Sequence, residues 1–343
     1  MTARPSSRLV AVVAMTCAAL LPLSASALSV APAAAAATVA VARIGSRGST
    51  VVVIQRVVHV KSDGVYSRGT AAAVKVWQRS HHLRATGVVD SLTWTKIRAV
   101  FAAIPVGNDV SWPQCPKGTG IPGRRGKGLP MPLASAPFVV IGLTNGPGFY
   151  PNPCLAAQSA WAKAHHVHTA TYAMTTYPTP GQFATYGLKG PYKGTSAKAK
   201  LANSGYVQAQ FNVFSMRKAG LVSPFMWVDV ESYPFAPWSR SKAANKAVVD
   251  GVLRGYRAYG LKVGVYSTPY LWKSVVGAAR YRLPEWRPAG PRGKAVAQAR
   301  CAAPSFQGGR AVLAQYSSAA ADYNIICPGF ANRAALAAHF HKY

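Results

Sequence analysis

Carboxylate side chains are scarce in this chain, and two of them stand close together. Only eight of the 343 residues are Asp or Glu, against 39 Lys and Arg. Asp229 and Glu231 end an apolar run that begins at Phe225. In a β-strand, residues i and i+2 point to the same face, roughly 6.6–6.8 Å apart at Cα. Both carboxyl groups would project together, which suits sugar hydrolysis: one protonates the leaving oxygen and the other handles charge at the anomeric carbon.

These carboxylates need a framework that brings strand ends together. From Gly107 onward, short apolar runs alternate with longer stretches of helical spacing. Such alternation over about 235 residues predicts an α/β fold with a parallel sheet, most economically a closed (β/α)8-type barrel. Catalytic groups in that fold sit at the C-terminal ends of the strands, which places the pair at the rim. The predicted strands are 138–143, 169–174, 225–230, 263–266 and 312–315, and the predicted helices are 155–165, 206–219 and 242–259.

A smaller unit precedes the predicted barrel. About 300 residues remain after the N-terminal segment, which favours one small and one large domain. Val74, Trp77 and Gln78 recur at i, i+3, i+4, as in a short amphipathic helix. Asp63-Gly64 marks a tight turn, and Gly87 marks another. We place this unit at residues 44–98, a linker at 99–106 and the barrel domain at 107–343.

The N-terminus has the pattern of a secretory signal peptide. Arg4 and Arg8 precede an apolar stretch at 9–21, and small residues offer cleavage sites near 27 or 37. A lipoprotein would need a modified Cys17, but Ala14-Met15-Thr16 lacks the usual approach to such a cysteine. No later segment approaches roughly 18 uninterrupted apolar residues, so no transmembrane segment is expected after signal removal. The protein is therefore predicted to be secreted, extracellular or associated with the cell wall.

Export bears on the cysteines. Loss of the signal leaves Cys115, Cys154, Cys301 and Cys327, an even number in an oxidising compartment, so two disulfides are expected. Three pairings are possible. We favour Cys115–Cys154 with Cys301–Cys327 because each pair then joins neighbouring segments of one domain. A zinc site is the competing interpretation, but none of the four falls in a Cys-x-x-Cys pair.

The formal net charge of +31 predicts an affinity for polyanions. Nucleic acid is not expected, because the basic residues are dispersed and surround no nucleic-acid-binding motif. Anionic polymers of the cell wall are possible partners, and the alternative is that the charge provides only solubility and weak adhesion. Two histidine clusters, at 81–82 and 165–168, lack the geometry of a metal site. No metal is therefore expected, and the absence of a phosphate loop argues against a nucleotide cofactor.

Residues 44–98 resemble the peptidoglycan-binding type 1 domain, a small three-helix module of exported wall enzymes. The resemblance depends on an ordered set in which each element alone is weak. A generic helical cap is the alternative interpretation. The set is Gly45-x-x-Gly48, Gln55, 63–66, Thr70, Ala73-Val74, Trp77-Gln78, Leu83, 87–89 and Thr93-Trp94.

The strand ends of the larger unit carry a second ordered set, of which Asp109-Val-Ser111 and Asp229-Val-Glu231 are the most specific parts. It resembles glycoside hydrolase family 25 over residues 107–343. That resemblance implies a modified β/α barrel and a lysozyme-like muramidase that cuts between N-acetylmuramic acid and N-acetylglucosamine. The set is 107–112, Tyr172, 229–231, 265–267, Gln315-Tyr316 and 322–324.

The resemblance implies Glu231 as general acid/base. Asp229 would orient or electrostatically stabilise the acetamido group of the substrate, and Asp109 and Asp322 would complete an acidic cleft. Clustered carboxylates fit this chemistry independently, because neighbouring negative charge raises the pKa of a carboxylic acid toward neutral pH. The alternative is that the pair is structural and contacts nearby Arg and Lys.

A sugar also needs flat apolar surfaces for its ring faces, and aromatic side chains near the strand ends are candidates, although such positions also serve as core. The predicted substrate-binding residues are Trp112, Tyr172, Trp227, Tyr266, Gln315, Tyr316 and Asn324.

The chain also departs from the family. A Lys-Ala-Thr-Glu-Gly-like stretch on the second strand is replaced by residues 142–148, where Asn145 and Gly146 stand and the charged pair is absent. Asn108 replaces an aliphatic residue before the aspartate. Divergent branches can lose activity while keeping the fold.

Two functions from different classes therefore stay open. The first is an exported peptidoglycan hydrolase, in which a wall-binding module raises the local substrate concentration for a muramidase barrel. The second is a catalytically inactive wall-binding or glycan-binding protein that retains the barrel. A third, weaker hypothesis makes the target another glycan polymer of the envelope. The Gly- and Pro-rich insertion at 116–137 is predicted to be a surface loop near the rim, and a cleft blocked by it would favour the second function.

Overall fold

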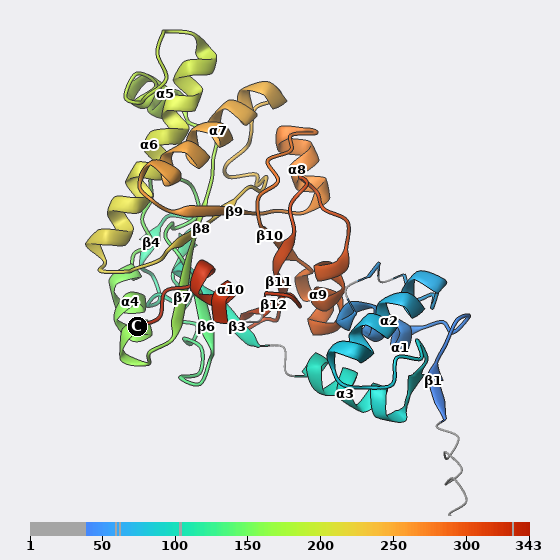
Figure 1. Ribbon diagram of the computed structural model, residues 1–343. Helices are drawn as coiled ribbons and strands as arrows, with labels where there is room; N and C mark the ends of the chain where they lie inside the picture. The colour runs from blue at the N-terminus through green and yellow to red at the C-terminus, as the bar shows by residue number, and fades with distance from the viewer. Residues whose placement is uncertain (1–38, 59, 62, 103–104, 331–332) are drawn as a thin grey trace, which may run out of the picture. The chain divides into compact units, whose positions relative to one another are not determined.

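The computed structural model describes residues 39–58, 60–61, 63–102, 105–330 and 333–343 (Figure 1). The predicted signal peptide and Cys17 lie outside the described residues. The described chain contains a small helical unit followed by a closed barrel, which confirms the predicted fold class. No helix of the described residues is long and apolar enough to cross a membrane.

The small unit has three helices, as predicted: α1 (Ser49–Val57), α2 (Arg68–Ser80) and α3 (Ser91–Ala102). Strand β1 (Ala40–Ala42) pairs antiparallel with β2 (Val89–Asp90). Ser67 begins α2 by accepting the Thr70 N–H, which satisfies a backbone donor that has no partner within the helix. Val74, Trp77 and Gln78 are all buried, which places the predicted stripe of α2 in the core.

Two buried glutamines hold the turns of this unit. In each set, Oε1 accepts the N–H of a turn glycine at 2.9 Å, and Nε2 donates to a valine carbonyl and a threonine hydroxyl. The sets are Gln55 with Gly64, Val65 and Thr70, and Gln78 with Gly87, Val88 and Thr93. Every member has its counterpart 23 positions later (55 to 78, 64 to 87, 70 to 93). The sequence analysis did not recognise this internal repeat because its two copies share few other residues.

Eight strands close the barrel in the order β10-β11-β12-β3-β6-β7-β8-β9. All five predicted strands are present, with ends shifted by one or two residues. The strands are β3 (Val106–Val110), β6 (Phe138–Gly142), β7 (His168–Met174), β8 (Phe225–Asp229), β9 (Lys262–Tyr266), β10 (Glu285–Pro288), β11 (Ala311–Ser317) and β12 (Asp322–Ile326).

Strand β12 departs from the parallel arrangement of the predicted barrel, because it runs antiparallel to both of its neighbours, β11 and β3. Only residues 318–321 separate β11 from β12, and a parallel crossover needs a dozen or more residues. The chain must therefore turn back directly. As a consequence, the first residue of β12, Asp322, lies at the rim formed by the C-terminal ends of the parallel strands, paired with Asp109 of β3.

Helices surround the barrel, and three of them match the prediction: α4 (Leu155–Ala164), α6 (Ala197–Lys218) and α7 (Lys242–Ala258) (Figure 1). Helix α6 begins nine residues before the predicted 206, at a Ser196 cap that accepts the Ala199 N–H. The sequence analysis missed the shorter helices α5 (Pro180–Tyr186), α8 (Pro269–Val276), α9 (Gly293–Ala302) and α10 (Arg333–His339). Helices α5, α8 and α10 have only seven or eight residues, which is too short for a helical period to stand out, and α9 follows directly on the Gly- and Pro-containing segment 289–292.

The two faces of each strand have different partners. On β8, Met226 and Val228 pack outward in the cluster that contains the helices. Phe225 and Trp227 pack inward with Trp286 and other residues of the barrel interior. Asp229 continues this inward row one step beyond Trp227, since alternate residues share a face. The packed interior therefore forms the base beneath the rim.

Glycines bring α6 and α7, the helices on either side of β8 in sequence, into close contact. A methyl group on Gly251 would overlap the Ala202 carbonyl oxygen, and one on Gly205 would overlap the Val248 carbonyl oxygen. Two backbones can approach this closely only where a side chain is absent. Gly205 and Gly251 therefore fix how α6 and α7 pack beside β8, the strand that carries Asp229.

We predict that Gly251→Ala lowers the free energy of unfolding by about 1–3 kcal/mol, because the added methyl must push the two helices apart. Gly181→Ala in α5 is the matched control, since nothing lies within 4 Å of the added methyl. That control should be neutral or stabilising by up to about 1 kcal/mol, the helix preference of Ala over Gly. Urea unfolding of both variants tests this, and equal stabilities would contradict the close contact.

Candidate active site

A cavity of about 220 Å³ opens at the rim of the barrel. Seven of the eight strands, or the residues just after them, contribute to its wall. The lining residues are Asp109, Tyr172, Asp229, Glu231, Tyr233, Tyr266, Trp286, Gln315 and Asp322. The structure thus brings all four predicted catalytic carboxylates into one cavity.

The other four acids of the chain have structural partners. Asp250 accepts from Lys246 and Tyr281, and Glu285 pairs with Arg287 at 2.6 Å in a buried ion pair. In the small unit, Asp63 accepts from Gln55, and Asp90 accepts the Thr93 N–H at the start of α3. The cavity therefore contains half of the chain's acids, and Lys or Arg is absent from its lining residues.

Asp109 is held by amides from the last two strands of the barrel. Its Oδ1 accepts from Gln315 Nε2 at 2.9 Å and from Asn324 Nδ2 at 2.6 Å. Gln315 Oε1 in turn accepts from the Tyr266 hydroxyl at 2.8 Å, and Asn324 Oδ1 accepts from Trp286 Nε1 at 2.7 Å. These bonds fix the orientation of Asp109 and link five strands around one carboxylate.

Asp229 is the last residue of β8 and is only 8% exposed. Its Oδ1 is buried and has no hydrogen-bond partner among the described residues. Burial raises the pKa of Asp229 well above its usual value, and the nearby charges of Glu231 and Asp109 raise it further. An unpaired buried oxygen is costly, so this atom is suited to accept a hydrogen bond from a bound molecule.

Glu231 lies just beyond β8, in the loop that follows the strand. The Tyr233 hydroxyl donates a hydrogen bond to Glu231 Oε2, and Trp238 Nε1 donates to the Glu231 backbone oxygen at 2.7 Å. Burial raises the pKa of the Glu231 carboxyl, while the Tyr233 bond acts in the opposite direction. Glu231 is more exposed than Asp229, which gives it access to a molecule in the cavity.

The carboxyl groups of the cavity stay protonated up to a higher pH than isolated carboxyl groups do. Burial raises the pKa of Asp109 to about 7, with a further contribution from the charge of Asp322. Burial also raises the pKa of Asp322. Protonated and ionised carboxyls can therefore coexist near neutral pH, which is the arrangement that general acid catalysis requires.

The predicted substrate contacts separate into groups. Tyr172, Tyr266 and Gln315 line the cavity. Asn324 is completely buried and supports Asp109 from behind. Trp112 is not among the lining residues, and its ring instead faces Arg124 and Lys127, each 5.7 Å from the ring centroid.

Two further predicted contact residues do not line the cavity. Trp227 is fully buried in the barrel interior, where it packs against Phe225 and Trp286. Because Trp227 stands two residues before Asp229, it shares the inward face of β8, but it lies one layer of side chains below the cavity. Tyr316 follows Gln315 and therefore points to the opposite face of β11, where it stacks on Tyr323 at 5.1 Å.

Sequence reasoning missed two lining residues, Tyr233 and Trp286. Tyr233 stands two positions after Glu231, so continued alternation beyond the strand could have identified it. Trp286 lies in β10, whose four residues Glu-Trp-Arg-Pro lack an apolar run. Its flanking Glu285 and Arg287 form the buried ion pair on the outer side of the strand.

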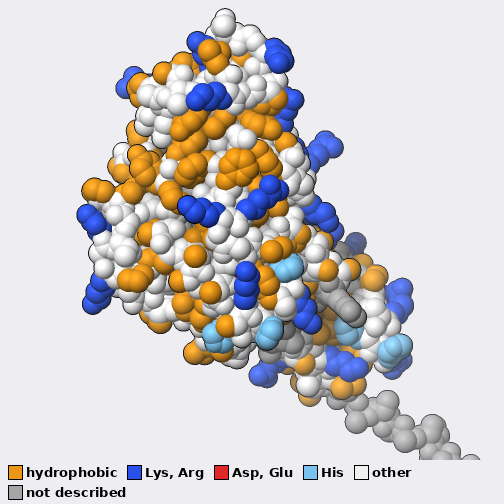
Figure 2. Space-filling view, turned by 90° about the vertical axis from the view of Figure 1, so that its left-hand side faces the viewer, with side chains coloured by type: hydrophobic (Ala, Val, Ile, Leu, Met, Phe, Trp, Pro, Cys, Tyr) orange, Lys and Arg blue, Asp and Glu red, His pale blue; other side chains and the backbone are white. Residues whose placement is uncertain are grey.

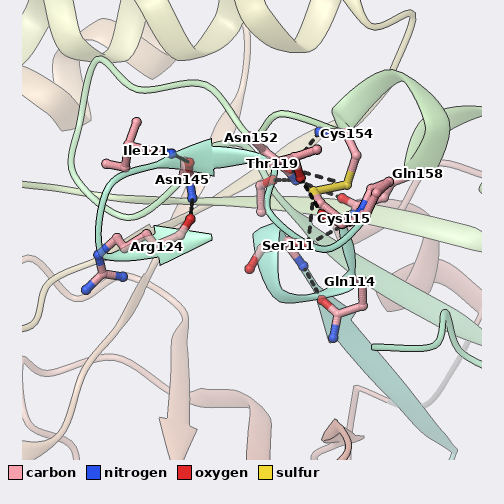
Figure 3. Close-up of a disulfide and its surroundings, with 12 residues drawn as sticks. Ser111, Gln114, Cys115, Thr119, Ile121, Arg124, Asn145, Asn152, Cys154 and Gln158 are labelled. Atoms are coloured by element: carbon pink, nitrogen blue, oxygen red, sulfur yellow. Dashed lines mark hydrogen bonds between the residues drawn. A yellow bond between two sulfur atoms is a disulfide. The ribbon is translucent and has the colours of Figure 1, made fainter. Parts of the chain in front are cut away.

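Both disulfides of the favoured pairing are present, Cys115–Cys154 and Cys301–Cys327. Figure 3 shows the first of them beside a short hairpin of β4 (Gly120–Ile121) and β5 (Arg124–Arg125). The hairpin belongs to the predicted 116–137 loop. Among the described residues, no group of three His, Cys, Asp or Glu is arranged to hold a metal ion.

Two family models match parts of the chain. Residues 57–97 match the model described as a putative peptidoglycan binding domain, and residues 195–286 match the model described as lysozyme-like protein 1. The second match spans α6 to β10 and contains Asp229 and Glu231. These matches confirm the predicted resemblance to a peptidoglycan-binding module followed by a lysozyme-like domain.

Lysozyme-like protein 5 of Caenorhabditis elegans is 30% identical over 70 residues, which are 20% of this chain and 31% of that protein. The chain thus spans about a third of the length of this relative. Among solved structures, the lysozyme from Streptomyces coelicolor is 18% identical with a TM-score of 0.44, over 69% of this chain and 97% of that one. A family GH25 lysozyme from Aspergillus fumigatus is 15% identical with a TM-score of 0.42, over 65% and 94%.

The raised pKa of Asp109 predicts a pH dependence of stability. The unfolded carboxyl titrates near 3.8 and the folded one near 7, so between these values the folded state binds more protons. The contribution of this group to stability is fully present below pH 3.8 and is lost as the pH rises through 7. Relative to Asp109→Asn, the parent should lose up to about 1.4 kcal/mol of unfolding free energy per pH unit across this window.

Urea unfolding at pH 4.5, 6 and 8 measures this difference. Asp63→Asn is the control, because the Gln55 hydrogen bond lowers the pKa of Asp63 from its usual 3.8. The contribution of Asp63 is lost only as the pH falls below this value, so the difference between the parent and Asp63→Asn should stay constant from pH 4.5 to 8. A parent-minus-Asp109→Asn difference that stays constant with pH would contradict the burial of an ionisable Asp109.

Proposed function

We propose that this protein is an exported peptidoglycan hydrolase of the muramidase type, with an N-terminal module that binds the wall. One observation carries the proposal: four carboxyl groups with raised pKa values meet in one rim cavity together with aromatic rings. The match of residues 57–97 to a peptidoglycan-binding model supports the second part. The proposed domain boundaries are those predicted above, with the catalytic unit at 107–343.

In the proposed reaction, Glu231 gives its proton to the leaving oxygen as the glycosidic C–O bond breaks. Water adds to the anomeric carbon, and its proton returns to the Glu231 carboxylate. Glu231 is assigned this role because it is the more accessible carboxyl of the adjacent pair and because burial raises its pKa. The Tyr233 hydroxyl holds Oε2, which leaves the other carboxyl oxygen for the substrate.

Asp229 is proposed to bind the acetamido group of an N-acetylated sugar. Its buried Oδ1 lacks a donor among the described residues, and an amide N–H supplies one. Asp109, fixed by Gln315 and Asn324, and Asp322 beside it would stabilise the positive charge that develops on the sugar. Tyr172, Tyr266 and Trp286 would offer ring faces to the sugar.

The surface charge fits a polymer target outside the cell. The face in Figure 2 presents Lys and Arg side chains, and no acidic side chain of the described residues is in view on it. We propose that this charge retains the protein on anionic wall polymers, in addition to the binding module. Retention on a polymer raises the effective substrate concentration at the barrel without any new contact in the cavity.

We predict that the mature protein releases reducing ends from purified peptidoglycan and that Glu231→Gln lowers the rate by at least about 100-fold, the usual contribution of a general acid. Mass spectrometry of the fragments should find N-acetylmuramic acid at the new reducing ends. Asp250→Asn is the matched control, because it removes a carboxylate that contacts Lys246 and Tyr281 on the barrel's outer side. Its rate should stay within about twofold of the parent.

Other outcomes distinguish the alternatives. N-acetylglucosamine reducing ends would redirect the bond assignment, and release from a different envelope glycan would redirect the substrate. No release from peptidoglycan that the protein still binds would make it a catalytically inactive wall-binding protein. That second function has one observation in its favour, the absence of the charged pair on the strand that ends at Gly142.

A further inference from the structure

The β4–β5 hairpin is fixed beside the cavity by covalent and polar contacts. Cys115, five residues before β4, is joined to Cys154 at the start of α4. Asn145 lies against the hairpin, where its Oδ1 accepts the Ile121 N–H at 2.8 Å and its Nδ2 donates to the Arg124 carbonyl at 3.0 Å (Figure 3). Asn145 is 1% exposed. The backbone of Arg124 therefore has a defined position.

The side chain of Arg124 is held as firmly as its backbone. Its guanidinium carbon lies 3.2 Å from the ring centroid of Phe235, 6.0 Å from that of Tyr233 and 5.7 Å from that of Trp112. On its other side, the aliphatic stem passes directly over Gly146, where a methyl group would meet Cδ at 2.5 Å. Stacking on aromatic faces fixes the guanidinium plane and leaves its N–H edge available.

The stack connects Arg124 to the cavity. Phe235 stacks on Tyr233 at 5.1 Å, and Tyr233 both lines the cavity and donates to Glu231. The stacked rings of Phe235 and Tyr233 therefore link the cation to the carboxyl proposed to act as acid. Tyr233 and Phe235 are 37% and 43% exposed, so a molecule that enters the cavity can extend across them toward Arg124.

Arg124 lacks an anionic partner in the described part of the chain. No ion pair there includes it, and the chain's eight acids are all placed elsewhere. Its side chain is only partly exposed, and burial lowers the pKa of the guanidinium. A cation that is partly stripped of water and has free donors gains more from an anion than a fully solvated lysine does.

We propose that Arg124 is a specificity residue that binds an anionic group, a carboxylate or a phosphate, carried by the glycan that occupies the cavity. This inference rests on the proposed function, which identifies the molecule in the cavity as a glycan. The planar fork of a guanidinium matches the two oxygens of either anion. The Nζ atom of Lys127 lies 5.7 Å from the ring centroid of Trp112, so Lys127 adds a second positive charge near Arg124.

The proposal also gives a physical role to residues 142–148, the segment that departs from the family pattern. Asn145 supplies the two hydrogen bonds that seat the hairpin, and Gly146 provides the space for the Arg124 stem. A longer or charged side chain at either position would displace the hairpin. The charge that the second strand lacks is thus replaced, at the same rim, by a cation on the neighbouring loop.

Binding is measured in the full mature chain carrying Glu231→Gln, so that no ligand is consumed. The probes are soluble peptidoglycan strands with their peptide stems, which carry carboxylates, and a neutral hexamer of N-acetylglucosamine. Calorimetry gives the ratio of the two association constants. Arg124→Gln should lower this ratio about tenfold or more, the loss of one charge-assisted contact. Arg124→Lys, which keeps the charge without the fork, should lower it less.

Arg125→Gln is the matched control. It removes the same charge from the adjacent hairpin position, where the guanidinium donates to Gly118 O at 2.7 Å. The ratio should stay within about twofold of the parent, since a surface charge contributes little. An unchanged ratio in Arg124→Gln, or an equal loss in Arg125→Gln, would overturn the proposal.

To identify the anion, binding to cell walls is measured before and after their phosphate polymers are removed chemically. If Arg124→Gln still weakens binding to the walls without phosphate, the anion is a carboxylate. If the weakening disappears, the anion is a phosphate. The hydrolase proposal is tested separately in the parent protein. An Arg124-dependent ratio without any hydrolysis would retain this inference and reject the enzyme, whereas hydrolysis with an Arg124-independent ratio would do the reverse.

Discussion

Four carboxyl groups in one small cavity repel one another when they are ionised, and the barrel rim has to hold them together against that repulsion. Two features make this possible. Their pKa values rise, so that part of the charge is neutralised by protons. Amides of Gln315 and Asn324 orient Asp109, and closure of the sheet fixes the strands that carry these residues.

Charge of the opposite sign surrounds this cavity without neutralising it. Lysines and arginines would pair with the carboxylates and lower their pKa values if they entered, but none is among the lining residues. Arg124 comes near, but its guanidinium stacks on the rings of Tyr233 and Phe235 and is not among the lining residues. In the proposed function, this separation would allow an acidic reaction centre and a cationic recognition element to act on one polymer.

Strong local patterns made much of the fold predictable. The five predicted strands and three long helices have apolar runs or helical periods, and all are present. Strand β10 was missed because Glu285 and Arg287 satisfy each other in the core, a pairing that no sequence window reveals. The reversed direction of β12 follows from the link at residues 318–321, which is too short for a parallel crossover.

By itself, the sequence singled out Asp229, Glu231, Asp109 and Asp322 as candidate catalytic residues, through residue scarcity, spacing and family resemblance. Only the tertiary structure decided which side chains reach the cavity. Trp227 lies one layer too deep, Tyr316 is on the wrong face, and Tyr233 and Trp286 take their places. The physical reason is that a strand's composition indicates its burial, whereas depth within a closed barrel depends on the register of strands that are distant in sequence.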